Sequence, residues 1–244
     1  RSSARRESVK TNNNIKHMKV SLKTITPNLE QEIVEIARVS SSRKDKTENP
    51  AGLLNYLIKN RHWSPFEHGF MTMEIETSKA IGIQLLRHRS FTFQEFSQRY
   101  ATVTKLEPVE LRGQHKNNRQ SSTEVFDPEV SPLINNYTDC KASVAIQKFM
   151  AASQDLYNDL LEAGVARECA RMVLPMATST TIFMSGPIRS WIHLIQIRDD
   201  SHAQKEAQEI AREMKRIFTE QCPIIAEALE WTENKNEEVL EVRV

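Results

Sequence analysis

The chain has 244 residues, of which 39% are hydrophobic and 27% charged, the composition of an ordinary globular protein. Its formal net charge of +1 excludes a general attraction for polyanions, so any anion site must be local. No apolar run approaches the roughly 20 residues that span a bilayer, and no apolar signal-peptide core appears near the first residues.

The first 17 residues differ in composition from the rest. They carry five basic side chains and one acidic one, and Met18 follows them as a natural start would. This pattern predicts a flexible basic arm or a cloning remnant, and a targeting peptide fits less well because the segment lacks an amphipathic apolar face. We expect residues 18–232 to form one folded domain and 233–244 to be a tail.

The cysteines are three in number and far apart, so they form neither a disulfide framework nor a paired metal motif. Cys140, Cys169 and Cys222 each lie in an apolar, helix-like stretch. The pattern predicts reduced cysteines that serve packing, and hence a cytoplasmic protein.

Hydrophobic periodicity divides the first third of the chain into strands and helices. Residues 18–27 and 69–77 alternate as strands do, and Ser78 is placed to cap the helix that follows. Between and after the two strands we expect helices over 28–40, 51–62 and 78–89 and a polar loop over 41–50.

The rest of the chain is richer in helix. Residues 104–130 are polar and without periodicity, which predicts a long surface loop. Residues 130–162 predict an amphipathic helix with an apolar stripe, ending at Gly164. We expect a short helix over 165–175, a strand over 177–184, a helix over 188–198, and a long helix over 201–218 opened by a capping box, Ser201–Gln204. The fold class is therefore α+β, a single domain with a small, mostly antiparallel sheet packed by several long helices.

The stretch "RHRSFTFQEFSQRY" (87–100) concentrates arginines among aromatic rings. If the helix that begins at 78 continues to 88, Gln84, Arg87 and His88 share one face. Arginines this close repel one another unless an anion neutralises them, and the guanidinium fork suits phosphate. A solvated surface balanced by Glu95 is the alternative, but one carboxylate does not balance three arginines. The stretch therefore favours an anion site.

Three further groups contain candidate residues. Ser64 and Glu67 in "RHWSPFEH" (61–68) match a capping box, although a helix start also suits phosphate. Residues 186–204 place Arg189 and His193 one helical turn apart, with Arg198 at the helix end, where capping carbonyls is the alternative role. In "ARECARM" the arginines at 167 and 171 are four apart, and Arg171 has the more apolar setting.

Several kinds of site are missing. The six glycines never approach a dinucleotide or P-loop motif, and the histidines lack metal-ligand spacing, so we expect no metal. The sequence contains no arrangement of serine, histidine and aspartate that indicates a catalytic triad. Ser97 lies among arginines without an adjacent base, which favours holding an anion over acting as a nucleophile.

Arg87-His88-Arg89, seven residues and Ser97 together resemble the signature of the flavin-dependent thymidylate synthases, a match that chance gives on the order of once in a thousand chains. Further blocks resemble that family in the family's order: "ARVS" (37–40), "SPFEH" (64–68), "ARMVLP" (170–175) and "LIQIRDDSHAQ" (194–204). The resemblance covers roughly residues 18–232, which would be the catalytic domain.

The resemblance implies conversion of dUMP to dTMP, with methylenetetrahydrofolate as carbon donor, NADPH as reductant and FAD as hydride carrier. It implies an α+β homotetramer whose active sites lie between subunits, and no cysteine nucleophile. Arg198 resembles the residue that polarises the uracil ring, the catalytic role. The implied dUMP contacts are Gln84, Arg87, Glu95, Ser97, Arg99, Arg171 and Arg198, and the implied FAD contacts are Ser40, Ser64, Glu67, Arg87, His88, Arg89, Gln94, Glu95, Arg189, His193 and His202.

The resemblance is imperfect at three positions. Gln94 stands where relatives often carry asparagine, and Ser64 where threonine is common, and both keep hydrogen-bonding chemistry. Pro187 stands where a polar side chain often contacts flavin, and proline has no backbone N–H to donate. Two rival functions are a nucleic-acid-binding module, which the net charge of −3 over 18–244 disfavours, and a nucleotide-binding protein without flavin.

Overall fold

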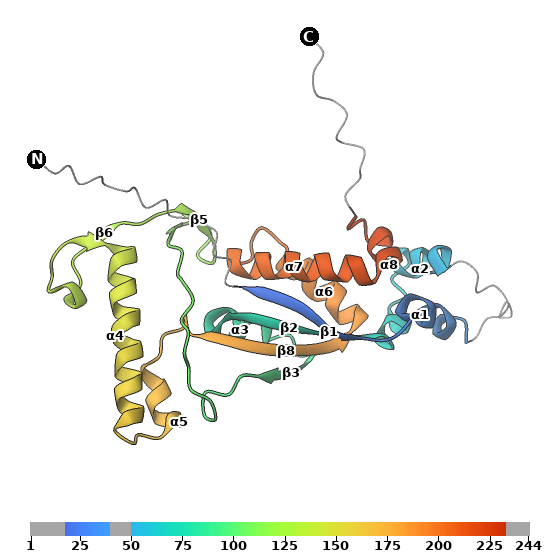
Figure 1. Ribbon diagram of the computed structural model, residues 1–244. Coiled ribbons are helices and arrows are strands. Elements are labelled where there is room, and N and C mark those ends of the chain that lie inside the picture. Colours follow the sequence, from blue (N-terminus) through green and yellow to red (C-terminus); the bar gives the residue numbers. More distant parts are fainter. Residues whose placement is uncertain (1–17, 40–49, 233–244) are drawn as a thin grey trace, which may run out of the picture.

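The core of the fold is a four-stranded antiparallel sheet with the strand order β1-β2-β8-β3. The structure, a computed structural model, describes residues 18–39 and 50–232 (Figure 1). The candidate residue Ser40 therefore lies outside the described residues. The strands are β1 (Lys19–Ile25), β2 (Phe70–Ser78), β3 (Thr92–Glu95) and β8 (Ser179–Pro187).

The two central strands, β2 and β8, are paired without a shift over nine residues, from Phe70 opposite Pro187 to Ser78 opposite Ser179. Along β2 every second side chain is fully buried, because successive side chains point to opposite faces of a sheet. β3 follows the arginine-rich turn at 87–91 and pairs with the far edge of β8. The sheet thus fixes that turn beside the residues that follow β8.

Two helices cover one face of the sheet, α6 (Ile188–Arg198) and α7 (Lys205–Gln221) (Figure 1). α6 begins directly after β8 and buries Trp191, whose indole N–H donates to the carbonyl of Met71 at 3.0 Å. Each large apolar side chain buried here stabilises the fold by roughly 1.5–3 kcal/mol. α6 is thereby held rigidly, with Arg198 as its last residue.

The expected capping box at Ser201–Gln204 is wrong. α7 begins at Lys205, and its N-cap, Gln204, accepts no side-chain hydrogen bond from the first turn. The Gln204 side chain instead bonds Gln84 at 2.7 Å, so a tertiary contact replaces the local cap.

Three helices pack together at one end of the sheet: α1 (Leu29–Ala37), α2 (Pro50–Lys59) and α8 (Pro223–Ala228). A carboxylate oxygen of Glu30 accepts from the backbone N–H of Ile225 at 2.7 Å and ties α1 to α8. The short 3₁₀ helix η1 (Ser64–Glu67) follows α2 and contacts α6.

The helix α3 (Lys79–Leu85) is shorter than the sequence predicts. Ser78 does cap it, since its hydroxyl accepts from the backbone N–H of Ile81 at 3.4 Å. The helix ends before Arg87, so the expected helical face shared by Gln84, Arg87 and His88 is wrong. Residues 86–91 turn instead, because Phe91 packs against Trp191 with ring centroids 4.8 Å apart and directs the chain into β3.

The segment between β3 and β8 forms an arm that stands beyond the end of the sheet (Figure 1). Its main helix is α4 (Ala142–Glu162), followed by α5 (Arg167–Ala170) and the 3₁₀ turn η3 (Arg171–Val173). A separate small core around Val103, Tyr157 and Ala170 joins α4 to α5. Gly164 ends α4 as expected, in the left-handed conformation at φ 85°.

Two expectations for the arm are wrong. Residues 104–130 are not a featureless loop, because β4 (Arg112–Gln114) pairs with β5 (Ser122–Val125) and Arg112 is bonded to Glu206 of α7 at 2.6 Å. The stretch from 130 to 141 is not helical. It holds β6 (Glu129–Val130), β7 (Cys140–Lys141) and the 3₁₀ turn η2 (Leu133–Asn135).

The apolar stripe expected on α4 is only partly buried. Ala145 is buried, but Phe149 is 52% and Leu156 is 47% exposed, and the helix instead packs through Ser153 and Tyr157. The exposed apolar side chains of α4 bear on assembly, which is taken up below.

The cysteines are free, but only Cys222 is buried. Cys140 is half-buried in β7, and Cys169 is exposed on α5, so the packing role expected for Cys169 is wrong. In the described residues, no helix is both long enough and apolar enough to cross a membrane.

Candidate active site

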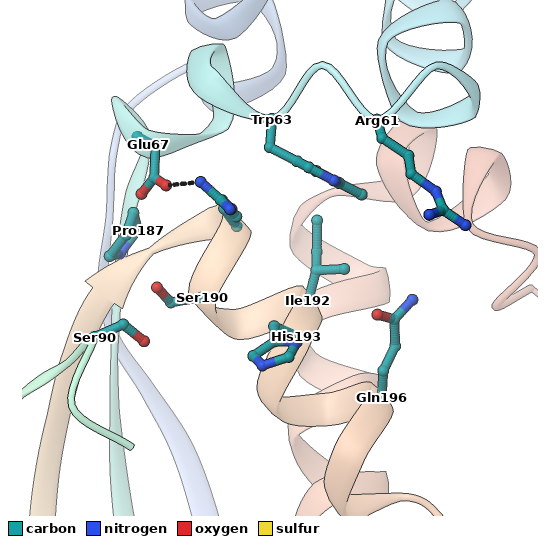
Figure 2. Close-up of a pocket in the computed structure, with 10 residues that line it drawn as sticks. Arg61, Trp63, Glu67, Ser90, Pro187, Ser190, Ile192, His193 and Gln196 are labelled. Atoms are coloured by element: carbon teal, nitrogen blue, oxygen red, sulfur yellow. Dashed lines mark hydrogen bonds and ion pairs between the residues drawn. The ribbon is translucent and has the colours of Figure 1, made fainter.

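A cavity of about 690 Å³ opens beside α6, between the end of α2, η1 and the arginine-rich turn (Figure 2). It brings together Glu67, Arg189 and His193, three of the candidate FAD contacts. α6 supplies most of the wall because its residues at helical spacing point the same way. The full lining is Arg61, Trp63, Glu67, Ser90, Pro187, Arg189, Ser190, Ile192, His193 and Gln196.

An ion pair closes one end of the cavity. Arg189 donates from Nη1 to a carboxylate oxygen of Glu67 at 2.7 Å, which appears as the dashed line in Figure 2. Glu67 therefore does not act in a capping box: η1 has Trp63 as its N-cap and no side-chain cap, and Ser64 is exposed. The side chains of Arg189 and Glu67 are 51% and 40% exposed, so their ion pair adds little to the stability of the fold and mainly orients the two groups.

Arg198 connects α6 to the end of α3. Its Nε donates to Nε2 of His88 at 3.0 Å, and Nη2 donates to the backbone carbonyl of Gln84 at 3.1 Å. Because Nε2 of His88 accepts this bond, the ring is neutral with its proton on Nδ1. The structure thus joins three predicted site residues although the helix that was expected to align two of them stops short.

The electrostatics of this group follow from burial. Burial, with the charges of Arg198 and His193, lowers the pKa of His88 from 6.5 to about 4. Burial and the charge of Arg87 lower the pKa of Arg198, yet an arginine stays protonated at any physiological pH. A half-buried guanidinium with a neutral histidine beside it is therefore a fixed positive charge with donors left for a ligand.

Glu95 lies in a different environment, at the end of β3. Its carboxylate accepts from Lys79 at 2.8 Å and from the hydroxyl of Thr180 at 2.9 Å. The alternative reading, in which Glu95 balances the arginines, is not what the structure shows, because the ion-pair partner of Glu95 is Lys79. The arginines of the turn are therefore available to bind other anions.

The remaining dUMP candidates lie toward the arm. Arg99 pairs with Glu168 of α5 at 3.1 Å, with both side chains more than half exposed. Arg171 in η3 is half-buried and has no ion-pair partner in the described chain, and Ser97 lies between β3 and this region. The cavity beside α6 is lined by none of Arg99, Arg171 and Arg198.

Four other candidates are exposed. The side chains of Arg87, Arg89 and Gln94 have no hydrogen-bond or ion-pair partner within residues 18–39 and 50–232, while His202 bonds Asp200 at 2.7 Å. Two guanidiniums without carboxylates on one turn form a positively charged surface. This feature is the strongest sign of an anionic ligand.

Sequence reasoning missed several cavity residues. Gln196 is three residues beyond His193 on the same face of α6, so helical spacing was the signal that would have found it. Trp63 and Ser90 are separated by a strand and a helix, and only the fold brings them together. Arg61 has a left-handed backbone, which no periodic pattern reveals.

A close approach of backbone and ring fixes the arginine-rich turn. A Cβ added to Gly186 of β8 would lie 2.4 Å from Cδ1 of Phe91. Glycine lets the phenyl ring lie directly on the strand, and this contact anchors the turn that carries Arg87 and Arg89.

Comparison with known proteins identifies relatives of this chain. The family described as "Thymidylate synthase complementing protein" matches residues 21–224. The chain is 44% identical over 204 residues to a "Probable flavin-dependent thymidylate synthase" of Paramecium bursaria Chlorella virus 1, covering 83% of this chain and 91% of that one. It is 44% identical over 199 residues to a "Flavin-dependent thymidylate synthase" of Synechocystis, covering 82% and 88%.

A solved structure is similar as well. It is a UMP/dUMP methylase, PolB, of Streptomyces cacaoi bound with 5-Br dUMP, at a TM-score of 0.71 and 26% identity, covering 88% of this chain and 95% of that one. The resemblance noted from the sequence motifs is thereby confirmed: the chain belongs to the flavin-dependent thymidylate synthase family.

Proposed function

We propose that the protein converts dUMP to dTMP through the groups around Arg198, using FAD. Methylenetetrahydrofolate provides the carbon and NADPH the hydride that reduces it to a methyl group, so that tetrahydrofolate and NADP⁺ are the other products. The observation that carries the proposal is the set of guanidiniums at 87, 89 and 198, which have no carboxylate partner in the described chain.

The residues present fit FAD. The cavity is large enough for part of a dinucleotide, and its wall combines the indole of Trp63 with hydrogen-bonding groups of Ser90, Ser190 and Gln196. Arg87 and Arg89 are free to bind a pyrophosphate, which matches the guanidinium fork. When bound, FAD supplies hydride transfer between NADPH and the carbon that becomes the methyl group. The residues that would hold it are Glu67, Arg87, His88, Arg89, Gln94, Glu95, Arg189, His193 and His202, with Ser64 and Ser40.

Arg198 has the chemistry to activate the pyrimidine. A guanidinium beside N3 and O2 of uracil stabilises the negative charge that develops there as C5 attacks the one-carbon unit. His88 and the carbonyl of Gln84 hold the guanidinium in place before substrate binds, so little reorganisation accompanies the reaction. The neutral state of His88 also avoids a competing positive charge next to Arg198.

The phosphate and sugar of dUMP need separate holders. We assign this role to Gln84, Arg87, Glu95, Ser97, Arg99 and Arg171, with Ser97 and Arg99 nearest the phosphate. For Arg99 this means exchanging Glu168 for phosphate, which is feasible because that ion pair is exposed and weak.

No cysteine among the described residues lines the cavity. Burial raises the pKa of the Cys222 thiol, so it stays protonated and cannot act as a thiolate nucleophile. Electrostatic activation by Arg198 therefore replaces a covalent attack on C6.

The enzyme works as a homotetramer with its active sites between subunits. Two observations support this part of the proposal: none of the predicted dUMP contacts lines the cavity beside α6, and α4 exposes Phe149 and Leu156 on one side. Burying such a stripe against a second copy removes apolar surface from water. The cytoplasmic location expected from the cysteines stays a prediction.

The test is a dTMP assay with each component left out in turn. Product should require dUMP, methylenetetrahydrofolate, NADPH and FAD together. Formation of dTMP without FAD, or none with all four present, would reject the proposal. Binding of dUMP with no binding of FAD and no product would favour the rival, a nucleotide-binding protein without flavin.

A further inference from the structure

Helix α2 ends in a left-handed turn that an arginine occupies. The backbone N–H of His62 donates to the carbonyl of Leu57 at 2.8 Å, and that of Arg61 to the carbonyl of Ile58 at 3.0 Å. These are the two bonds of a Schellman motif, in which the residue at the position of Arg61 is left-handed and usually glycine. Arg61 indeed has φ 57°, an unfavourable conformation for a residue with a Cβ.

The same motif ends two other helices of this chain. α4 ends with the corresponding bonds from Gly164 and Val165, and there glycine holds the left-handed position at φ 85°. α8 ends with the bonds from Glu230 and Trp231, with Glu230 at φ 59°. Arg61 lines the cavity described above, whereas Glu230 does not. The arginine with the strained backbone therefore lies at the candidate active site, and strained backbone conformations are often found at functional sites.

The charges of the cavity lining single out Arg61. Its charged side chains are Arg61, Arg189 and Glu67, and the last two neutralise each other at 2.7 Å. The side chain of Arg61 has no hydrogen-bond or ion-pair partner in the described part of the chain. In Figure 2, Arg61 lies at the opposite end of the row of side chains from Glu67, near Trp63 and Gln196.

We infer that Arg61 binds an anionic group, a phosphate or a carboxylate, of a co-substrate that enters the cavity past Trp63. This inference rests on the proposed function, which supplies two such groups: the 2′-phosphate of NADPH and the glutamate carboxylates of the folate. The guanidinium fork suits either one. The left-handed backbone of Arg61 fixes the direction in which its side chain leaves the helix. The local backbone strain is thus the cost of placing this side chain at the cavity.

The test measures binding rather than turnover, with dUMP present, on flavin-loaded protein whose flavin has first been reduced chemically without oxygen, so that NADPH binds without reacting. Calorimetry gives the Kd of NADPH, of NADH, and of tetrahydrofolate with one and with three glutamates, for the wild type and for R61A, R61K and R61G. We expect R61A and R61G to raise one Kd about tenfold, the loss typical of a charge-assisted hydrogen bond, and R61K to raise it less. A loss confined to NADPH over NADH identifies the phosphate, and a loss that grows with glutamates identifies the carboxylates.

The matched control is E230G, which removes the same strain away from the cavity. We expect R61G and E230G each to raise Tm by about 2–4 °C, since relief of the left-handed residue is the shared effect. R61A keeps the strain and should leave Tm unchanged. E230G should leave every Kd unchanged.

Three results would overturn the inference. Kd values for all four ligands within twofold of wild type in R61A would show that Arg61 binds no co-substrate. Loss of FAD from R61A would assign the arginine to the resident cofactor instead. A lower Tm for R61G would contradict the claim that the left-handed backbone at residue 61 is strained by the arginine side chain. Failure of the wild type to form dTMP would reject the proposed function and leave these binding results standing.

Discussion

Arg198 donates to His88 at 3.0 Å and to the carbonyl of Gln84 at 3.1 Å, and so joins the last residue of α6 to the end of α3. The bond to His88 requires a neutral imidazole, and the burial that lowers the pKa of His88 to about 4 keeps it neutral. One guanidinium is thus held by two segments 110 and 114 residues away in sequence. This arrangement supports the catalytic role that we propose for Arg198.

Replacing Arg198 by alanine tests that role directly. We expect kcat for dTMP formation to fall about 10²–10³-fold, because a preorganised donor aimed at developing charge contributes roughly 3–4 kcal/mol. The control is R212A, which removes an exposed arginine of α7 that pairs with Asp199. Steady-state kinetics of both variants, with far-UV circular dichroism to confirm folding, measure the difference. Equal losses in R198A and R212A would contradict a special role for Arg198.

The His88 bond predicts a pH dependence of stability. Since the pKa of His88 is lowered in the folded state, the unfolded state binds more protons between pH 6.5 and about 4. The contribution of His88 is therefore complete above pH 6.5 and lost as the pH falls through that window. We expect a loss of about 1–2 kcal/mol, less than the full shift implies, because the half-buried ring is partly screened by solvent.

The variant H88Q isolates this contribution. A glutamine oxygen accepts the bond from Arg198 and does not titrate in this range. Urea unfolding at pH 7, 6, 5 and 4 gives the difference in the free energy of unfolding between the wild type and H88Q. The effect of the titrating carboxylates cancels in this difference, because both proteins contain them. Parallel curves for the two proteins would show that His88 is not coupled to folding.

The sequence predicts the position of a site residue when local secondary structure determines it, and fails when packing between distant segments determines it. Helical spacing placed Arg189 and His193 on one face and Arg198 at the helix end, because α6 forms over the predicted residues 188–198, whereas the role of Arg198 came from the family resemblance. Arg87 and His88 were placed on a helix that ends too early, because packing of Phe91 on Trp191 overrides local propensity. The partnership of Glu95 with Lys79 depends on how β3 and α3 meet, a contact between segments that no local pattern encodes.

The Glu67–Arg189 pair should matter for cofactor binding more than for folding. We expect E67A to lower the free energy of unfolding by at most about 1 kcal/mol, since both side chains are roughly half exposed. The Kd for FAD should rise about tenfold, because Arg189 loses the group that orients it toward the cavity. E220A, which removes an exposed partner of Arg216 on α7, is the control. Flavin fluorescence titration measures the Kd, and an unchanged value would remove Glu67 from the site.

Gly186 links the sheet to the arginine-rich turn. G186A places a Cβ against the ring of Phe91 at 2.4 Å, and the displaced ring should destabilise the fold by about 1–3 kcal/mol. Activity should fall as well, since the turn with Arg87 and Arg89 must shift. The control is G52A in α2, where nothing lies within 4 Å of the added Cβ, and a gain of about 0.5–1 kcal/mol is expected. Thermal unfolding with equal losses in both variants would contradict the packing argument.

The exposed stripe of α4 predicts how copies assemble. L156E adds a charge to a side chain that is 47% exposed, so the single chain should still fold. In the proposed tetramer the charge would be buried, and we expect dissociation with loss of dUMP binding. A151E, at an exposed position on another side of α4, is the control. Light scattering that finds L156E and wild type in the same assembly would place the interface elsewhere.

The most direct test of the central claim is the absorbance spectrum of the purified protein supplied with FAD. Anaerobic reduction with NADPH is then followed with and without dUMP. The account predicts bound flavin whose absorbance bleaches faster when dUMP is present, because the arginines hold both nucleotides in one site. Absence of bound flavin at saturating FAD would contradict it, and the arginines of residues 87–99 would then serve a different anion.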